Sequence, residues 1–114
     1  MNIRDRIPVC PHRDKLDIDF FLISSLTRLE SLIGKPLLFG SGLRCEECNK
    51  LVGGRPNSAH LRGFAVDCSA GDSQRRYNIL SNAMIIGFRR IGIGKYFIHL
   101  DTDLTLPQEV IWLY

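Results

Sequence analysis

Apolar residues recur at helical spacing in residues 17–33, and this pattern predicts an amphipathic helix there. Either Asp17 or Asp19 can cap the start of this helix, because a short acidic side chain accepts hydrogen bonds from the first free backbone N–H groups. Gly34 can end it, because glycine readily adopts the left-handed conformation of a helix C-cap. The apolar positions of the predicted helix are Phe20, Phe21, Ile23, Leu26, Leu29 and Ile33.

The rest of the chain predicts one more helix and several short strands. Residues 73–86 follow Asp72, a candidate N-cap, and precede Gly87, a candidate helix stop. The segment 40–56 is rich in glycine and polar residues and is predicted to be a loop. This order of elements predicts an α+β fold with a small antiparallel sheet and flanking helices. Short apolar runs predict strands at residues 36–39, 64–68, 88–91, 96–100 and 110–113.

Length and composition restrict the class of protein. The 114 residues suit one domain, because domains typically hold ~100–150 residues, and we treat residues 1–16 as its N-terminal extension. A content of 45% hydrophobic and 24% charged residues is typical of a globular chain and argues against disorder. Apolar stretches such as Phe20 to Ile23 and Val110 to Tyr114 are far shorter than the ~20 residues that a membrane-spanning helix needs.

Charge adds little about partners. The formal net charge is +3, and no run of basic residues or basic patch with interleaved aromatics is present, so we expect no nucleic-acid partner. We expect a monomer that does not bind membranes. Charges interrupt the first residues throughout, whereas a secretory signal needs an apolar core of ~7–15 residues. We therefore expect synthesis in the cytoplasm without a classical export signal.

The cysteines leave two interpretations open. A chain without an export signal is expected to be reduced, so we favour free thiols that are buried or partly buried. Cys45 and Cys48 form a CxxC pair that Cys10 and His12 could complete as a second zinc site. A structural zinc site usually needs two such pairs, or one pair and a pair of histidines, so we prefer free thiols and assign His12 no role. The four cysteines are Cys10, Cys45, Cys48 and Cys68.

Candidate metal ligands occur in two segments. His60 and Asp67 flank Gly63 in a loop that leads into a predicted strand, while His99 and Asp101 lie two positions apart and share one strand face. His60, Asp67 and His99 offer two nitrogen ligands and one oxygen ligand, a set that can hold catalytic zinc with a fourth position left to water. On spacing alone, histidines held by structural hydrogen bonds are the commoner explanation.

Several motifs follow one another in order around these residues, and residues 87–94 and 110–114 fit the same pattern. Together they cover residues 17–114 and resemble the D-alanyl-D-alanine carboxypeptidase-like zinc peptidases, which share a fold with the hedgehog signalling domain. Several motifs in order are far more specific than any one of them. The motifs are Ser41-Gly42-Leu43-Arg44, Asn49, Gly53-Gly54, Ser58 to Asp67, and Phe97-Ile98-His99-Leu100-Asp101.

The resemblance implies a function and a site. It implies that His60, Asp67 and His99 bind zinc, that Arg44 engages a substrate carbonyl or carboxylate, and that Ser58 contacts substrate. A turn cap is the alternative role for Ser58. The implied activity is hydrolysis of peptide bonds in peptidoglycan stem peptides, as a D-Ala-type carboxypeptidase, a dipeptidase, or an endopeptidase such as a phage endolysin. The implied site of action is the cell wall or periplasm, reached in some members as a phage product.

The catalytic base is where the chain departs from its relatives. Many of them carry an acidic residue three positions before the last histidine ligand, where this chain has Tyr96; others carry a histidine where this chain has Phe97. Asp101 is the nearest titratable replacement and our candidate base. An equally weighted alternative is that Asp101 orients the His99 ring. Tyr96 could instead donate a hydrogen bond to an oxyanion.

Two other classes of function stay open at this point. A zinc-bearing but catalytically weak module that binds cell-wall peptides or a protein would account for Tyr96 at the usual acidic position. A small structural protein without any metal would need none of the proposed ligands.

Overall fold

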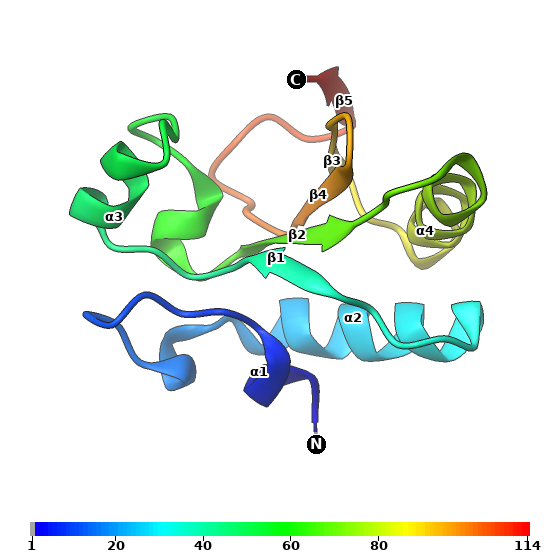
Figure 1. The fold of residues 1–114 in the computed structure, drawn as a ribbon, viewed down its shortest axis with the longest axis horizontal. Helices are drawn as coiled ribbons and strands as arrows, with labels where there is room; N and C mark the ends of the chain where they lie inside the picture. Colours follow the sequence, from blue (N-terminus) through cyan, green and yellow to red (C-terminus); the bar gives the residue numbers. More distant parts are fainter. Residues whose placement is uncertain (1) are drawn as a thin grey trace.

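The computed structural model describes residues 2–114 and contains a five-stranded sheet with two long helices packed against it and shorter helices at its margins (Figure 1). The helices are α1 (Ile3–Arg6), α2 (Phe20–Ile33), α3 (Glu46–Leu51) and α4 (Ser73–Ile86), with two 3-10 turns, η1 (Lys15–Asp17) and η2 (Ala59–Arg62). The strands are β1 (Phe39–Ser41), β2 (Ala65–Ser69), β3 (Arg90–Ile93), β4 (Phe97–Asp101) and β5 (Val110–Leu113). The predicted α+β class is confirmed.

The sheet has the strand order β1-β2-β4-β3-β5. All neighbouring pairs are antiparallel except β3 and β5, which are parallel, so the predicted antiparallel sheet is in fact mixed. Arg90 at the start of β3 pairs with both Asp101 at the end of β4 and Val110 at the start of β5. The loop after β4 therefore returns the chain to the edge where β3 begins, and β5 runs in the direction of β3.

The first long helix begins at Phe20 rather than at residue 17, since Asp19 and not Asp17 is its cap, while its end and both ends of the second helix lie where predicted. The Asp19 carboxylate accepts a hydrogen bond from the backbone of α2, and Gly34 ends this helix in the left-handed conformation at φ 74°. Asp72 caps α4 in the same way, and Gly87 ends it at φ 101°. These termini agree with the expectation because capping is a local property of the chain.

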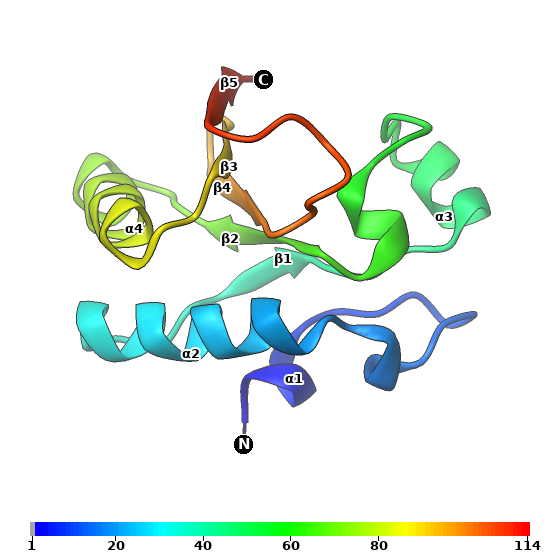
Figure 2. The same cartoon turned by 180° about the vertical axis from the view of Figure 1, so that it is seen from behind.

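The core lies between the two long helices and one face of the sheet. In Figures 1 and 2, α2 runs along the sheet, and α4 lies next to one end of α2. The two helices contact each other. Strand β4 alternates, so that Ile98 and Leu100 enter this core while His99 and Asp101 lie on the opposite face. The core residues of the helices are Leu22, Leu26, Leu29, Ile79 and Ala83.

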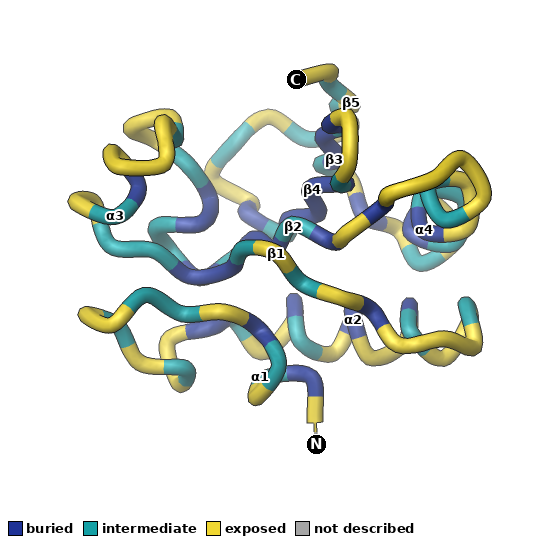
Figure 3. Tube along the Cα trace, viewed as in Figure 1, coloured by how far each residue is buried: buried dark blue, intermediate teal, exposed yellow. Residues whose placement is uncertain are grey.

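The buried stripe of α2 is narrower than its sequence indicates. Phe20 and Phe21, predicted on the apolar face, are 76% and 67% exposed. The residues that do pack inward lie at i, i+3, i+4 and i+7, the spacing of one helix face, and appear as dark segments of α2 in Figure 3. They are Leu22, Ser25, Leu26 and Leu29.

The segment between the two long helices differs most from the prediction. Strand β1 begins at Phe39 rather than at residue 36, and the predicted loop 40–56 contains the short helix α3. Leu37 is buried, and its backbone N–H donates to Glu30 on α2 instead of joining the sheet. A helix of six residues is too short to show a helical period in its sequence.

Residues 2–16 pack onto the rest of the domain. Ile3 and Ile7 belong to the hydrophobic core, and Val9 forms an isolated parallel bridge with Leu43. This segment therefore lies against α2 and the start of the loop that carries Arg44 (Figure 2). Within residues 2–114, no helix combines the length and apolar character needed to cross a bilayer.

Glu30 ties the N-terminal segment to the central helix. Its carboxylate accepts from the Arg6 guanidinium at 2.6 Å and from the Leu37 backbone N–H at 2.7 Å. The hydrogen bond from Arg6 lowers the pKa of the Glu30 carboxyl below its ordinary value. Because the folded pKa is lowered, this pair stabilises the protein above the unfolded pKa of ~4.3 and loses its effect as the pH falls through the folded pKa.

Glu30→Gln is therefore expected to lower the free energy of unfolding at pH 7 by about 1–2 kcal/mol, the range of a hydrogen bond to a charged group in a partly exposed site. The difference from the parent protein should shrink as the pH falls below about 4. Urea denaturation at pH 7 and pH 3.5 measures both values. A difference that stays constant between these pH values would contradict the assigned ion pair.

Candidate metal centre

Three different elements deliver the predicted metal ligands to one point. His60 lies on η2, Asp67 on β2 and His99 on β4, and Asp67 and His99 are direct partners across the two strands. Ser58 caps η2, its hydroxyl accepting from the His60 backbone N–H at 3.2 Å. Gly63 ends η2 at φ 78°, so the chain can turn directly into β2. The cap gives Ser58 its structural role, while its contact with substrate stays a prediction.

The ligand atoms of these three residues face one another. The Asp67 Oδ1 atom lies 3.3 Å from His60 Nε2 and 3.2 Å from His99 Nδ1. All three ligand atoms lie within 4.8 Å of one another. His60 and His99 are buried, whereas Asp67 is partly exposed, so the centre is reached from solvent on the side of Asp67.

The far nitrogens of both rings are held by acceptors. His60 Nδ1 lies 2.7 Å from the Gly42 carbonyl oxygen, and His99 Nε2 lies 2.6 Å from Asp101 Oδ2. Because a carbonyl and a carboxylate only accept, these nitrogens carry the hydrogens, and the neutral rings turn their lone pairs toward Asp67. Two lone pairs and a carboxylate in contact repel one another unless a cation lies among them. The donor set therefore fits a divalent metal ion such as zinc.

The electrostatics of the centre also favour positive charge. Burial opposes ionisation of Asp67, but hydrogen bonds from the His60 and His99 rings in their protonated, cationic form outweigh it and hold the pKa of the carboxyl below its usual range. Burial would likewise lower the pKa of His99, but Asp101 and Asp67 outweigh it and raise that pKa above its ordinary value. Both shifts have the direction expected of a site that keeps Asp67 ionised and stabilises positive charge.

Asp101 is fully occupied by structural contacts. Its Oδ2 atom accepts from His99, and its Oδ1 atom accepts from Arg90 Nε at 2.8 Å and from the Asp103 backbone at 3.2 Å. The residue is only 1% exposed. Of the two roles that the sequence leaves open, these contacts support orientation of the His99 ring; the role of catalytic base stays a prediction.

Arg44 lies beside the centre with part of its guanidinium unpaired. Its backbone N–H donates to the His60 carbonyl at 3.1 Å, which fixes the loop to η2. Among residues 2–114, its buried Nε atom has no hydrogen-bond partner. Burial lowers the pKa of Arg44, and the Asp67 carboxylate and the Tyr114 phenol, once it is ionised at high pH, oppose this shift, which places the three side chains within electrostatic reach. An unpaired, partly desolvated guanidinium is suited to binding a carboxylate or a carbonyl oxygen.

Trp112 on β5 and Tyr114, which directly follows this strand, lie beside the centre, although the sequence motifs do not assign them to it. The Trp112 ring lies 5.2 Å from the His99 ring, and the Tyr114 ring lies 6.4 Å from it. Gly92 pairs with both His99 and Trp112, and a side chain at this position would run into the Trp112 ring. The two-residue spacing of Trp112 and Tyr114 indicates that both side chains lie on one face of a strand. The sequence did not predict that this strand pairs in parallel with β3, which brings that face to the centre.

Tyr96, the candidate oxyanion donor, is not part of this cluster. It is 63% exposed and lies in the turn before β4, with the Lys95 ammonium over its ring. Tyr114 is the tyrosine that lies next to the metal ligands. Burial raises the pKa of Tyr114 above its ordinary value, so its phenol is a hydrogen-bond donor at neutral pH.

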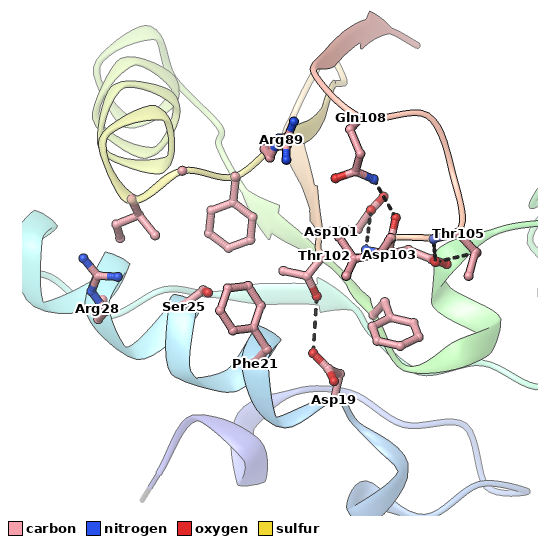
Figure 4. Close-up of a pocket in the computed structure, with 15 residues that line it drawn as sticks. Asp19, Phe21, Ser25, Arg28, Arg89, Asp101, Thr102, Asp103, Thr105 and Gln108 are labelled. Carbon is pink, nitrogen blue, oxygen red and sulfur yellow. Dashed lines mark hydrogen bonds between the residues drawn. The ribbon is translucent and has the colours of Figure 1, made fainter.

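A separate cavity of about 470 Å³ lies behind the centre, between α2, the end of α4 and the loop after β4 (Figure 4). Phe21 lines it, and Thr102 donates to Asp19 across it at 3.4 Å. Asp101 lines this cavity as well, but within the described part of the chain His60, Asp67 and His99 do not. The metal ligands therefore belong to a different, more open surface.

The four cysteines form no disulfide, and Cys68 is buried while the other three are partly buried, as expected of reduced cysteines. The preference for free thiols over a second zinc site stays a prediction. His12, to which the sequence assigns no role, contacts the CxxC pair in the fold. His12 lies within 3.5 Å of Cys45 Sγ and 3.7 Å of Cys48 Sγ.

A small α+β domain with two histidines and one aspartate around a cation-binding point is the architecture of a metal-dependent hydrolase. Residues 10–101 match the family described as peptidase M15. The match covers most of the chain, so the chain belongs to this family of zinc peptidases, and the resemblance seen in the motifs is confirmed. The search of curated proteins finds no match. Family and site together indicate a metallopeptidase-type function.

Gly63 has the strictest steric requirement near the centre. At φ 78°, an alanine side chain would be strained and would also run into the Asp17 carbonyl oxygen. Gly63→Ala is expected to lower the free energy of unfolding by about 2–5 kcal/mol. Gly53→Ala is the matched control, because φ is 73° there but nothing lies within 4 Å of the added carbon. That variant should lose only ~1–2 kcal/mol. Equal losses in urea denaturation would contradict the assigned contact.

Proposed function

We propose that this protein is a zinc metallopeptidase that hydrolyses peptide bonds in peptidoglycan stem peptides, as a D-Ala-type carboxypeptidase or as an endopeptidase of the endolysin kind. The observation that carries the proposal is that the ligand atoms of His60, Asp67 and His99 converge on one point, with the unpaired guanidinium Nε of Arg44 beside it. Membership of the M15 family supports it. The proposed partner is therefore a stem peptide, and the proposed place of action is the cell wall or periplasm.

His60, Asp67 and His99 would hold the zinc ion in this proposal. Bound zinc supplies a Lewis acid and lowers the pKa of a water molecule toward ~7. The Gly42 carbonyl and the Asp101 carboxylate fix the tautomers of the two histidines, so that both lone pairs stay directed at the ion. This preorganisation avoids the cost of turning two imidazole rings during each turnover.

Arg44 and Tyr114 would bind the substrate. The Arg44 guanidinium can donate two parallel hydrogen bonds to a terminal carboxylate, or one to the carbonyl oxygen of the scissile bond. The neutral Tyr114 phenol can donate a further hydrogen bond to the same oxygen as negative charge develops on it. Both side chains lie within electrostatic reach of Asp67, the one partly exposed ligand of the centre.

Digestion of purified peptidoglycan and of defined muropeptides, followed by mass analysis of the products, tests the proposal. The zinc-loaded protein should release D-alanine or cut stem peptides, and a chelator should abolish the activity. Arg44→Ala should lower kcat/KM by ~10²–10³, the usual effect of losing one stabiliser of the developing charge. Arg89→Ala is the control, because Arg89 is exposed and its guanidinium pairs with Glu109. Stoichiometric zinc without cleavage of any stem peptide would refute the enzymatic proposal.

Asp101→Asn separates the two roles of Asp101. If Asp101 only orients His99, its removal should lower the zinc affinity by ~10–100-fold. The value of kcat/KM in saturating zinc, and the pH dependence of kcat/KM, should then change little. We expect this result. A base would instead leave kcat/KM reduced by ~10²–10⁴ at saturating zinc and remove the acidic limb of the profile. Glu109→Gln, an exposed acid paired with Arg89, controls for the loss of one negative charge.

A second candidate function is a zinc-bearing module that binds cell-wall peptides with little or no turnover. The observation that favours it is the absence of an acidic side chain at position 96, where an exposed tyrosine stands. Binding of muropeptides by calorimetry without any product in the digestion would select this function.

A further inference from the structure

A second group of metal-binding side chains lies apart from the centre described above. Cys10 and His12 come from the N-terminal segment, and Cys45 and Cys48 come from the N-cap and first turn of α3. The four ligand atoms lie within 4.8 Å of one another. The two pairs are more than thirty positions apart in the chain, and Cys10 and Cys45 are separated by 35 positions. Their convergence is therefore a property of the fold.

The distances within this group fit tetrahedral coordination. With a Zn–S bond of ~2.3 Å and a Zn–N bond of ~2.0–2.1 Å, the edge between a sulfur and a nitrogen ligand of a tetrahedron is ~3.6 Å. His12 Nδ1 lies 3.5 Å from Cys45 Sγ and 3.7 Å from Cys48 Sγ. The group therefore needs almost no rearrangement around its two best-defined edges to accept an ion.

Backbone N–H groups already point at two of the sulfur atoms. The Cys45 N–H donates to Cys10 Sγ at 3.3 Å, and the Cys48 N–H donates to Cys45 Sγ at 3.4 Å. Hydrogen bonds of this kind stabilise thiolates, which are the form in which cysteine binds a metal. They also fix the direction of the sulfur lone pairs before any ion arrives.

The chemistry of the donors selects the kind of ion. Three thiolates and one imidazole are soft and borderline ligands, which suit zinc and disfavour calcium, magnesium or manganese. Four protein ligands leave no position for water or substrate, so such a site is closed and structural. It therefore differs in composition and in purpose from the His60, Asp67 and His99 centre, which keeps a side open to solvent.

We propose that Cys10, His12, Cys45 and Cys48 bind a structural zinc ion that fastens the N-terminal segment to the loop carrying Arg44. Cys45 directly follows Arg44 in the chain. The ion would reinforce the existing contacts between the two segments, in which the Leu43 N–H donates to the Pro8 carbonyl and the Arg13 guanidinium donates to the Arg44 carbonyl. Closing this long loop restricts the unfolded chain, as a crosslink does.

The proposal is independent of the proposed function, and its test requires no enzymatic assay. Purified full-length protein is reconstituted with cobalt or zinc, and metal content is measured together with the thiolate-to-cobalt charge-transfer band in the near ultraviolet. We expect about two metal ions per chain and a strong band. His60→Ala should lose one ion and keep the band, because its centre contains no thiolate. One ion per chain without a thiolate band in the parent protein would overturn the proposal.

A matched pair of variants at His12 keeps the test independent of folding, because His12 is exposed and outside the core. His12→Ala should weaken metal binding at this site and shift the band, whereas His12→Cys should retain the ion as a four-thiolate site. Cys68→Ala is the control, since Cys68 is buried in β2 away from the group, and it should keep both ions and the band. A band that is lost in Cys68→Ala and kept unchanged in His12→Ala would overturn the proposal.

Discussion

The mutual repulsion of three acceptor groups is the constraint on which the site depends. His60 and His99 are buried and direct their lone pairs at the Asp67 carboxylate, because the Gly42 carbonyl and Asp101 hold the hydrogens of both rings on the far side. A protein could relieve this repulsion by separating the groups. Here the pairing of β2 with β4 and the cap of η2 prevent separation, so the site is poised for a cation.

The sheet explains how so small a domain can support such a centre. One face of β4 supplies Ile98 and Leu100 to the helical core, and the opposite face supplies His99 and Asp101. Packing of the core residues fixes the strand, and the strand in turn fixes the metal ligands on its other face. The loops need only add Arg44, whose position is fixed by a backbone hydrogen bond to η2.

Local features of the sequence predicted much of this, and nonlocal ones did not. The start and end of α4 follow from Asp72 and Gly87, because capping is decided within one turn. The centre followed from motif resemblance, while spacing alone left structural histidines the commoner explanation. The place of Tyr114 was not predicted because it depends on the parallel pairing of β5. The contact of His12 with the CxxC pair was considered but not preferred, because the two segments lie more than thirty residues apart in the chain. Pairing across long separations leaves no periodic signal in a single sequence.

The position of Trp112 gives the protein an optical reporter of its own centre. Trp112 is the single tryptophan of the chain, and its indole lies 5.2 Å from the His99 ring and 5.0 Å from the Arg90 guanidinium. Arg90 in turn binds the carboxylate that holds His99. Protonation of His99, or arrival of an ion beside it, changes the electric field on the indole, so that tryptophan emission follows occupancy of the centre without any added label.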